Sequence, residues 1–269
     1  METVSDINDG ESKNDGTEEQ SGAAAGGEGR AWPWLLLCIA AALLVRLYVL
    51  YAEQFIDRDA VYYLDLVRQW HAGSFRDLMR DDPQLYVLPM AYFLFKEAMR
   101  LGVDSLTAAY IVNIGLGTAL VPLMYGCGKE IFASRGMGLL AALLTAFNPL
   151  LVDLSVQILR DVAMLFGLAV ALWCAVKGER KSWGWWFPAG IGVAFAVLSR
   201  YEAAEALPLA GVYLGVDWLT GGGGLRQAAG KIGCLVLGTL VGLVVFSAVM
   251  GVPWEFYSVN FLNKAKAYL

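Results

Sequence analysis

Seven long apolar segments constrain the fold of this chain more than any other feature of its sequence. They cover residues 33–52, 106–125, 136–152, 162–176, 183–198, 203–219 and 232–250. A helix needs about 20 mainly apolar residues to cross the hydrocarbon core of a bilayer, and aromatic residues that flank the shorter segments can extend them. The chain is 58% hydrophobic and 17% charged, whereas soluble domains contain about 25% charged residues. The sequence therefore predicts an all-α, polytopic membrane protein with about seven transmembrane helices.

The first 31 residues have a different composition. They are rich in Gly, Ser and acidic residues, among them Glu2, Asp6, Asp9, Glu18 and Glu19. Such a segment buries too little apolar surface to offset its ordering entropy, and it lacks the basic region of a signal peptide. We expect residues 1–31 to form a disordered cytoplasmic tail and 32–250 to form the transmembrane module. Residues 251–269 would be an exoplasmic segment, with truncation as one explanation for its shortness.

Three short connections between the apolar segments are basic, which predicts the orientation of the chain. They carry Lys129 and Arg135, then Lys177, Arg180 and Lys181, and finally Arg226 and Lys231. Short basic loops lie in the cytoplasm. If the N-terminus is cytoplasmic, all three basic connections lie in the cytoplasm only when the short apolar stretch 85–99 does not cross the membrane. We therefore expect one large exoplasmic loop, 53–105, with helices that lie along the interface.

An acidic cluster, Asp57-Arg58-Asp59, follows the first apolar segment and precedes Tyr62 and Tyr63. A carboxylate here could accept a proton from an acceptor hydroxyl as a general base. It could instead hold a divalent metal such as Mg or Mn together with a bound phosphate. A third alternative is that Asp57 or Asp59 caps the helix that follows, with Arg58 as an ion partner of either.

The predicted topology places Asp161, Arg200 and Glu202 on the same outer face as Asp59. Asp161 is either a second carboxylate and metal ligand facing Asp59 across a cleft, or an acid that the dipole of its helix stabilises. Arg160 is a candidate for anion contact. Arg200 could bind a phosphate group in the forked geometry of a guanidinium, or it could extend to the membrane boundary and pair with Glu202.

His71 is the only histidine, so a metal centre built from several histidines is excluded. It is expected to have an interfacial structural role, with ligand contact or proton transfer as the alternative. Together with Tyr62, Tyr63 and Glu202 it completes the candidates for substrate contact. We expect no nucleic-acid partner.

The order of these features resembles the GT-C superfamily of integral-membrane glycosyltransferases. The branch is that of the dolichyl-phosphate-mannose protein mannosyltransferases and of the aminoarabinose and rhizobial lipopolysaccharide sugar transferases. The resemblance covers roughly residues 34–202. It is carried by Arg58-Asp59-Ala60-Val61-Tyr62-Tyr63, the Pro-containing stretch Asp82-Pro83-Gln84-Leu85-Tyr86-Val87-Leu88-Pro89, the basic loop Lys129-Glu130-Ile131-Phe132-Ala133-Ser134-Arg135, Asn148-Pro149-Leu150-Leu151-Val152 followed by Ser155, Arg160-Asp161, and Leu198-Ser199-Arg200-Tyr201-Glu202.

The resemblance implies a sugar donor carried on a polyprenyl phosphate and an inverting transfer on the exoplasmic face. The acceptor would be a lipid, a glycan or a protein in a bacterial inner or cell membrane. The resemblance assigns the role of base or metal ligand to Asp59, with Asp57 as a second candidate. It assigns the acidic position of the second outer loop to Asp161. Arg200, with Arg58 or Arg160, would lie near the donor phosphate.

Two departures from the family pattern lead to alternatives. Asp82-Pro83-Gln84 replaces the His-Pro-Pro pattern common in the first outer loop, and the chain stops at Leu269 where many relatives continue. An inactive truncated scaffold, or one half of an assembly with a second membrane subunit, is therefore an alternative. Another is a transporter or flippase of a lipid-linked substrate, which charges buried in the membrane would favour. Arg46 is the only charge well inside a predicted span, and we expect it to extend to the end of its helix.

Overall fold

The computed structural model describes residues 28–52, 58–81, 87–221 and 224–258. All regular structure in these ranges is helical, which confirms the predicted all-α fold. Asp57, residues 82–84 and nearly all of the predicted tail lie outside the described residues. The division of the chain into a tail, a module and a C-terminal segment stays a prediction.

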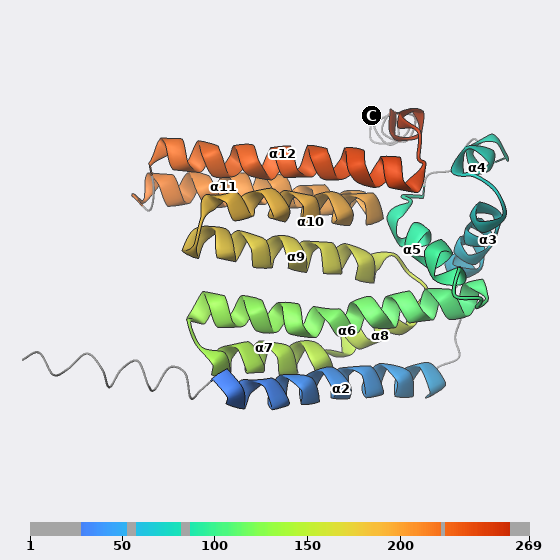
Figure 1. The fold of residues 1–269 in the computed structure, drawn as a ribbon, viewed down its shortest axis with the longest axis horizontal. Helices are drawn as coiled ribbons and strands as arrows, with labels where there is room; N and C mark the ends of the chain where they lie inside the picture. Colours follow the sequence, from blue (N-terminus) through green and yellow to red (C-terminus); the bar gives the residue numbers. More distant parts are fainter. Residues whose placement is uncertain (1–27, 53–57, 82–86, 222–223, 259–269) are drawn as a thin grey trace, which may run out of the picture.

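The predicted apolar segments form a bundle of helices that run side by side (Figure 1). Its helices are α2 (Glu28–Ala52), α6 (Ser105–Phe132), α7 (Arg135–Phe147), α8 (Pro149–Val156), α9 (Asp161–Arg180), α10 (Trp186–Ser199), α11 (Ala206–Leu219) and α12 (Leu225–Met250). Short 3-10 turns, η1 (Trp183–Trp185) and η2 (Tyr201–Glu205), precede α10 and α11.

Not every predicted span is long enough to cross a membrane as one straight helix. Within the described ranges, α2, α6, α9 and α12 meet the length and apolarity required, and the bent pair of α7 and α8 makes up to five. Helices α10 and α11 have 14 residues each, shorter than the roughly 20 of a full span. A 3-10 turn precedes each of them, yet both belong to the bundle, α10 beside α9 and α12, and α11 beside α12 (Figure 1).

The predicted third span is broken at Asn148, where α7 and α8 meet at 51°. Pro149 has no backbone N–H to continue the hydrogen bonds of α7, and a residue before proline favours an extended conformation. Asn148 adopts one, with φ −63° and ψ 116°. Its side chain then accepts a hydrogen bond from the backbone N–H of Leu151 at 3.2 Å. The break therefore has a local cause in two adjacent residues.

Arg46 lies inside α2 with none of its surface exposed. Its Nε donates to the hydroxyl of Ser155 on α8 at 3.1 Å. Its Nη1 donates to the carbonyls of Ala42 and Ala146 at 3.0 and 3.4 Å. Ala146 lies in the last turn of α7, where backbone carbonyls lack intrahelical donors. The prediction that Arg46 extends to the end of its helix is wrong, because the broken span supplies it with buried partners.

Glycines allow the second half of the bundle to pack backbone against backbone. A Cβ added to Gly238 of α12 would collide with the carbonyl oxygen of Phe187 on α10, and one added to Gly190 of α10 would collide with that of Leu235. A Cβ on Gly167 of α9 would lie 2.8 Å from the carbonyl oxygen of Gly192. Small residues at such interfaces are the usual means by which helices approach closely in a membrane.

Three short helices close one end of the bundle (Figure 1). They are α3 (Arg58–Ala72), α4 (Phe75–Asp81) and α5 (Met90–Met99). α3 buries Tyr63, Val67 and Trp70 on one face at helical spacing, in one core with Phe95 of α5. With 10 residues, α5 is too short to cross a membrane. The ring of Phe75 on α4 packs edge-on against that of Phe256, which follows α12, with 5.0 Å between the ring centroids. The cap formed by α3, α4 and α5 therefore contacts the segment that follows α12.

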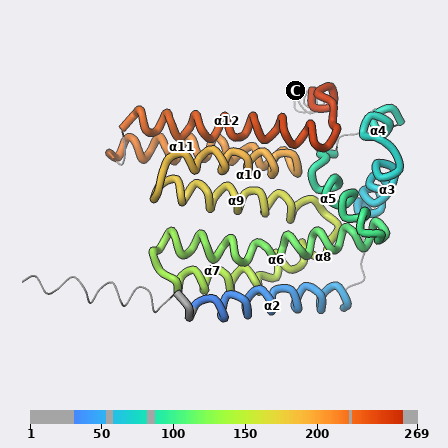
Figure 2. Tube along the Cα trace, in the orientation of Figure 1, coloured from blue at the N-terminus to red at the C-terminus, as the bar shows by residue number. Residues whose placement is uncertain are grey.

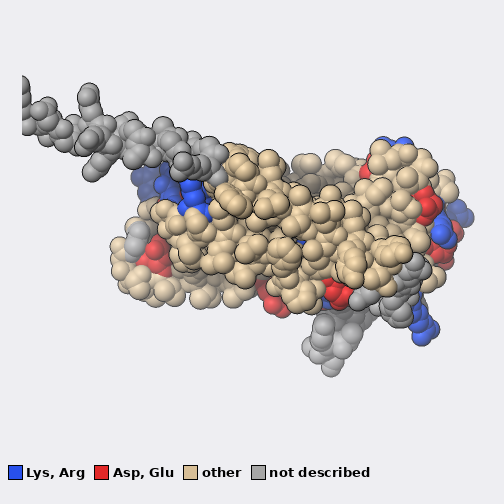
Figure 3. All heavy atoms as spheres, turned by 90° about the horizontal axis from the view of Figure 1, so that it is seen from below, with Lys and Arg blue, Asp and Glu red and all other residues tan. Residues whose placement is uncertain are grey.

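The two ends of the bundle differ in chemistry. The connections α6–α7, α9–α10 and α11–α12, which carry the predicted basic loops, lie at the same end as the start of α2 (Figure 2). The α8–α9 and α10–α11 connections lie at the other end, with the cap. Between the ends, the face that includes α2 and α7 is almost free of charged side chains (Figure 3). This distribution is that expected of a bundle that spans a bilayer.

Candidate functional site

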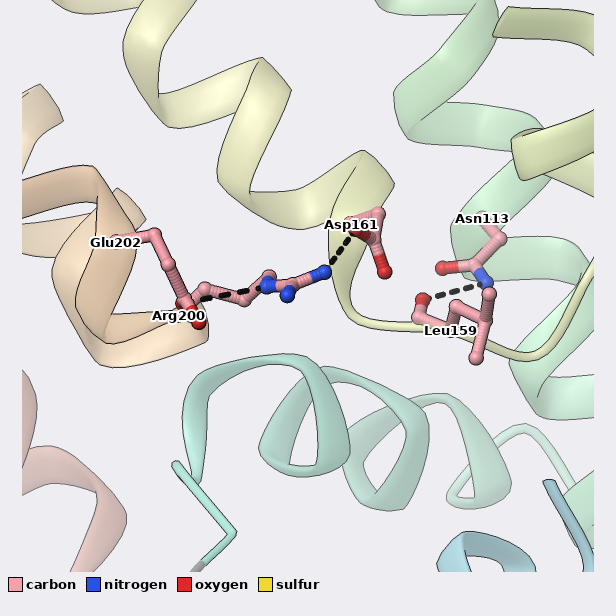
Figure 4. Close-up of polar contacts among 5 residues, drawn as sticks. All are labelled: Asn113, Leu159, Asp161, Arg200 and Glu202. Atoms are coloured by element: carbon pink, nitrogen blue, oxygen red, sulfur yellow. Dashed lines mark hydrogen bonds and ion pairs between the residues drawn. The ribbon is translucent and has the colours of Figure 1, made fainter. Parts of the chain in front are cut away.

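Asp161 and Arg200 form an ion pair at the capped end of the bundle (Figure 4). Asp161 opens α9, where the helix dipole favours a carboxylate. Arg200 follows α10 in an extended conformation, with φ −149° and ψ 136°. Its Nη1 donates to Asp161 Oδ1, and its Nε lies 3.3 Å from Glu202 Oε2. The predicted pairing of Arg200 with Glu202 is present, and Asp161 is a second partner.

The charge of Arg200 is held by its surroundings. Partial burial disfavours the cation, but the hydrogen bond to Glu202 and the negative charge of Asp161 outweigh it, so the pKa of Arg200 is raised. The side chains of Arg200 and Asp161 remain 30% and 18% exposed. The pair is therefore accessible from outside the protein, while its geometry is fixed from two helices.

Arg160 adds a second guanidinium beside this pair. It is the N-cap residue of α9, and its side chain makes no capping hydrogen bond. Burial raises the pKa of Tyr92 well above its usual value, and the charge of Arg160 acts in the opposite direction. Burial, and secondarily the neighbouring Tyr257, raise the pKa of Tyr201 to about 12, again opposed by Arg160. The charge of Arg160 thus acts on two phenolic hydroxyls whose raised pKa keeps them neutral and able to donate hydrogen bonds.

Asn113, fully buried on α6, fixes the loop that leads to Arg160 and Asp161. Its Nδ2 donates to the carbonyl of Gln157 at 2.7 Å and to that of Leu159 at 3.1 Å, the second of which is drawn in Figure 4. A buried backbone carbonyl needs such a donor, because leaving it unpaired costs about 1–3 kcal/mol. One side chain therefore holds two points of the connection between α8 and α9.

The other predicted site residues lie on α3. Asp59 is exposed in its first turn, next to Arg58. Tyr62 is half-exposed, whereas Tyr63 is buried with its ring centroid 5.0 Å from that of Tyr92. His71 is exposed in the last turn, and 12 residues of helix rise place it about 18 Å along the axis from Asp59. His71 and Asp59 are therefore too far apart to contact the same group of a substrate.

The described residues do not fit a divalent metal site as they are arranged. Among them there is no group of three or more His, Cys, Asp or Glu side chains placed to hold an ion. Asp161, one of the two predicted ligands, is bound by Arg200, whereas Mg²⁺ requires a set of oxygen ligands in octahedral geometry. Metal binding by Asp59 and Asp161 stays a prediction.

Tyr92, Tyr201 and Asn113 were not among the predicted site residues. Tyr201 lies between Arg200 and Glu202, so its neighbours in the sequence were the signal that could have indicated it. Tyr92 belongs to the apolar stretch 85–99 of the first loop, and the effect of Arg160 on its pKa depends on the tertiary structure. Asn113 is a polar residue in the middle of an apolar segment, a pattern that often marks a buried hydrogen bond in a membrane protein.

Comparison with known proteins identifies the family. A profile described as dolichyl-phosphate-mannose-protein mannosyltransferase matches residues 81–251, well over half of the 269 residues. The matched region contains Arg160, Asp161 and Arg200, and Asp59 precedes it. No match was found among curated proteins or among solved structures. The chain belongs to the dolichyl-phosphate-mannose-protein mannosyltransferase family of GT-C membrane glycosyltransferases.

Proposed function

We propose that this protein transfers a sugar from a polyprenyl-phosphate-linked donor to an acceptor hydroxyl on the exoplasmic side of a membrane. The observation that carries the proposal is the ion pair of Asp161 with Arg200 at the capped end of the bundle, directly after Arg160 in the sequence. The basic connections lie at the opposite end, which the positive-inside rule assigns to the cytoplasm. A lipid, a glycan or a protein could supply the acceptor hydroxyl.

The donor phosphate is the group that the cationic side chains suit. The positive charge of Arg160 acts on the neutral hydroxyls of Tyr92 and Tyr201, and a phosphate oxygen accepts hydrogen bonds from guanidinium and hydroxyl donors alike. The N-terminus of α9 adds its dipole at the same place. Arg200, oriented by Asp161 and Glu202, is the second cation. These groups would stabilise the charge that develops on the phosphate as the sugar leaves.

The transfer reaction needs a base for the proton of the acceptor hydroxyl, and a carboxylate can take this role. The acceptor oxygen forms a bond to the anomeric carbon, the bond between that carbon and the phosphate oxygen breaks, and the polyprenyl phosphate departs. The proton of the acceptor hydroxyl needs a base. Asp161 is engaged by Arg200, so we assign the base to Asp59, which is exposed on α3. Asp161 would then act by orienting Arg200.

Buried Arg46 favours a transporter, because charges inside a membrane often mark substrate pathways. It donates to the carbonyl of Ala42 within α2. Its hydrogen bonds to Ser155 and to the carbonyl of Ala146 hold α2 against the broken span. Its position fits a structural role, and we rank transport below transfer.

The test compares membranes that contain the wild type, Asp59→Asn or Asp65→Asn, each supplied with a panel of radiolabelled polyprenyl-phosphate sugars. Asp65 is the matched control, because it is also an exposed carboxylate on α3. We expect transfer by the wild type and by Asp65→Asn, and none by Asp59→Asn. Activity in all three would contradict the role of Asp59. Activity that EDTA abolishes and Mg or Mn restores would show that a metal takes part after all.

A further inference from the structure

A small pocket lies at the end of the bundle opposite the candidate site. It has a volume of about 240 Å³ and is lined by Ala31, Trp32, Leu35, Tyr125, Lys129 and Arg135. Three elements meet there, namely the start of α2, the last turns of α6 and the start of α7. One side is aromatic and aliphatic, and the other carries two cations.

The charges around the pocket favour an anion. Lys129 and Arg135 line it directly, and the N-terminus of α7, which begins at Arg135, adds a positive dipole end. The neighbouring acid Glu130 is directed to Lys181, whose Nζ lies 4.0 Å from its carboxylate. Trp32 is 63% exposed, at the level where tryptophan side chains lie in the headgroup region of a bilayer.

We propose that this pocket binds the phosphate of an anionic phospholipid. Lys129 and Arg135 would contact the phosphate oxygens, and Trp32, Leu35 and Tyr125 would pack against the glycerol and the upper part of an acyl chain. Basic pockets between transmembrane helices on the cytoplasmic side suit such headgroups. Since a water molecule occupies about 30 Å³, the volume holds roughly eight waters, enough space for a phosphate with its substituents. The proposal is independent of sugar transfer.

The test is native mass spectrometry of the full chain in detergent, titrated with phosphatidylglycerol or phosphatidylcholine. The pocket variant is Lys129→Gln with Arg135→Gln. Its control, Arg180→Gln with Arg226→Gln, removes the same charge from the same end of the bundle but outside the pocket. We expect wild type to prefer phosphatidylglycerol, the pocket variant to lose about tenfold or more in its affinity, and the control to lose about twofold at most.

Three results would overturn the proposal. The first is a wild type that binds both lipids equally. The second is an equal loss in the pocket variant and the control, which would indicate diffuse surface charge. The third is displacement of phosphatidylglycerol by an equimolar concentration of inorganic phosphate, since the apolar wall would then contribute nothing. If the double variant does not fold, Lys129→Gln alone, with Lys129→Arg as the rescue, decides by the same comparison.

Discussion

Asp161 and Arg200 are 39 positions apart in the sequence, yet their charged groups are in direct contact. They meet because α9 begins, and α10 ends, at the same end of the bundle (Figure 1). The antiparallel pairing of these two helices, made close by Gly167 and Gly192, therefore determines the geometry of the candidate site.

The forked contact of Arg200 with two carboxylates should be required for transfer. Lysine keeps the charge but cannot reproduce a guanidinium that reaches Asp161 and Glu202 at once. We expect Arg200→Lys to lower kcat/KM for the donor about tenfold, and Arg200→Gln to lower it about a hundredfold. Arg226→Gln, at the opposite end, is the control. Wild-type kinetics in Arg200→Lys would show that the fork has no catalytic consequence.

The donor group of Asn113 should be required for both stability and activity. In Asn113→Asp the side chain keeps its shape but presents oxygen atoms to the carbonyls of Gln157 and Leu159, which then lose their donor. Each lost hydrogen bond of this kind costs about 1–3 kcal/mol. We expect the Tm in detergent to fall by several degrees and transfer to fall with it, because the connection to Asp161 is no longer fixed. An unchanged Tm would contradict this role.

Backbone contact between α10 and α12 should tolerate no side chain at Gly238. Any Cβ there meets the backbone of Phe187, so Gly238→Leu should separate the helices and abolish accumulation of folded protein. Gly215→Leu on α11 is the matched control, because a Cβ at Gly215 has nothing within 4 Å. The measurement is the monodisperse fraction in size-exclusion chromatography. Equal yields of the two variants would argue against this interface.

Tyr201 should make stability sensitive to alkaline pH. Burial raises its pKa from 10.0 to about 12 in the folded protein. Between these values the unfolded chain releases the proton and the folded chain keeps it, so the free energy of unfolding falls as the pH rises. We expect a smaller fall in Tm between about pH 10 and pH 12, the range of this shift, in Tyr201→Phe than in the wild type. Tyr48→Phe, at an exposed position on α2, should match the wild type.

Much of the fold was predictable because apolar length and loop charge are local properties. The seven apolar segments became the helices of the bundle, and the basic connections lie together at one end. The lengths of α10 and α11 were harder to predict, because polar residues such as Arg200 and Glu202 change the backbone to an extended residue and a 3-10 turn. The break at Asn148 could have been predicted from Pro149.

The candidate site was predictable by residue type but not by contact. Asp161, Arg200 and Glu202 were each identified from charges at the ends of apolar segments, yet the ion pair between Asp161 and Arg200 depends on how α9 packs against α10. The role of Arg46 was predicted wrongly for the same reason. Its partners Ala146 and Ser155 are 100 and 109 positions away, and no local pattern indicates them.

These distant partners have a consequence for biogenesis. When α2 leaves the ribosome, Arg46 has neither Ser155 nor Ala146 to bind, and an arginine inside a lone helix disfavours its release into lipid by about 2.5–3.5 kcal/mol. We therefore expect α2 to stay near the translocon until α7 and α8 are synthesised. Helix α2, which precedes the other described helices in the sequence, would then be among the later ones to be fully integrated.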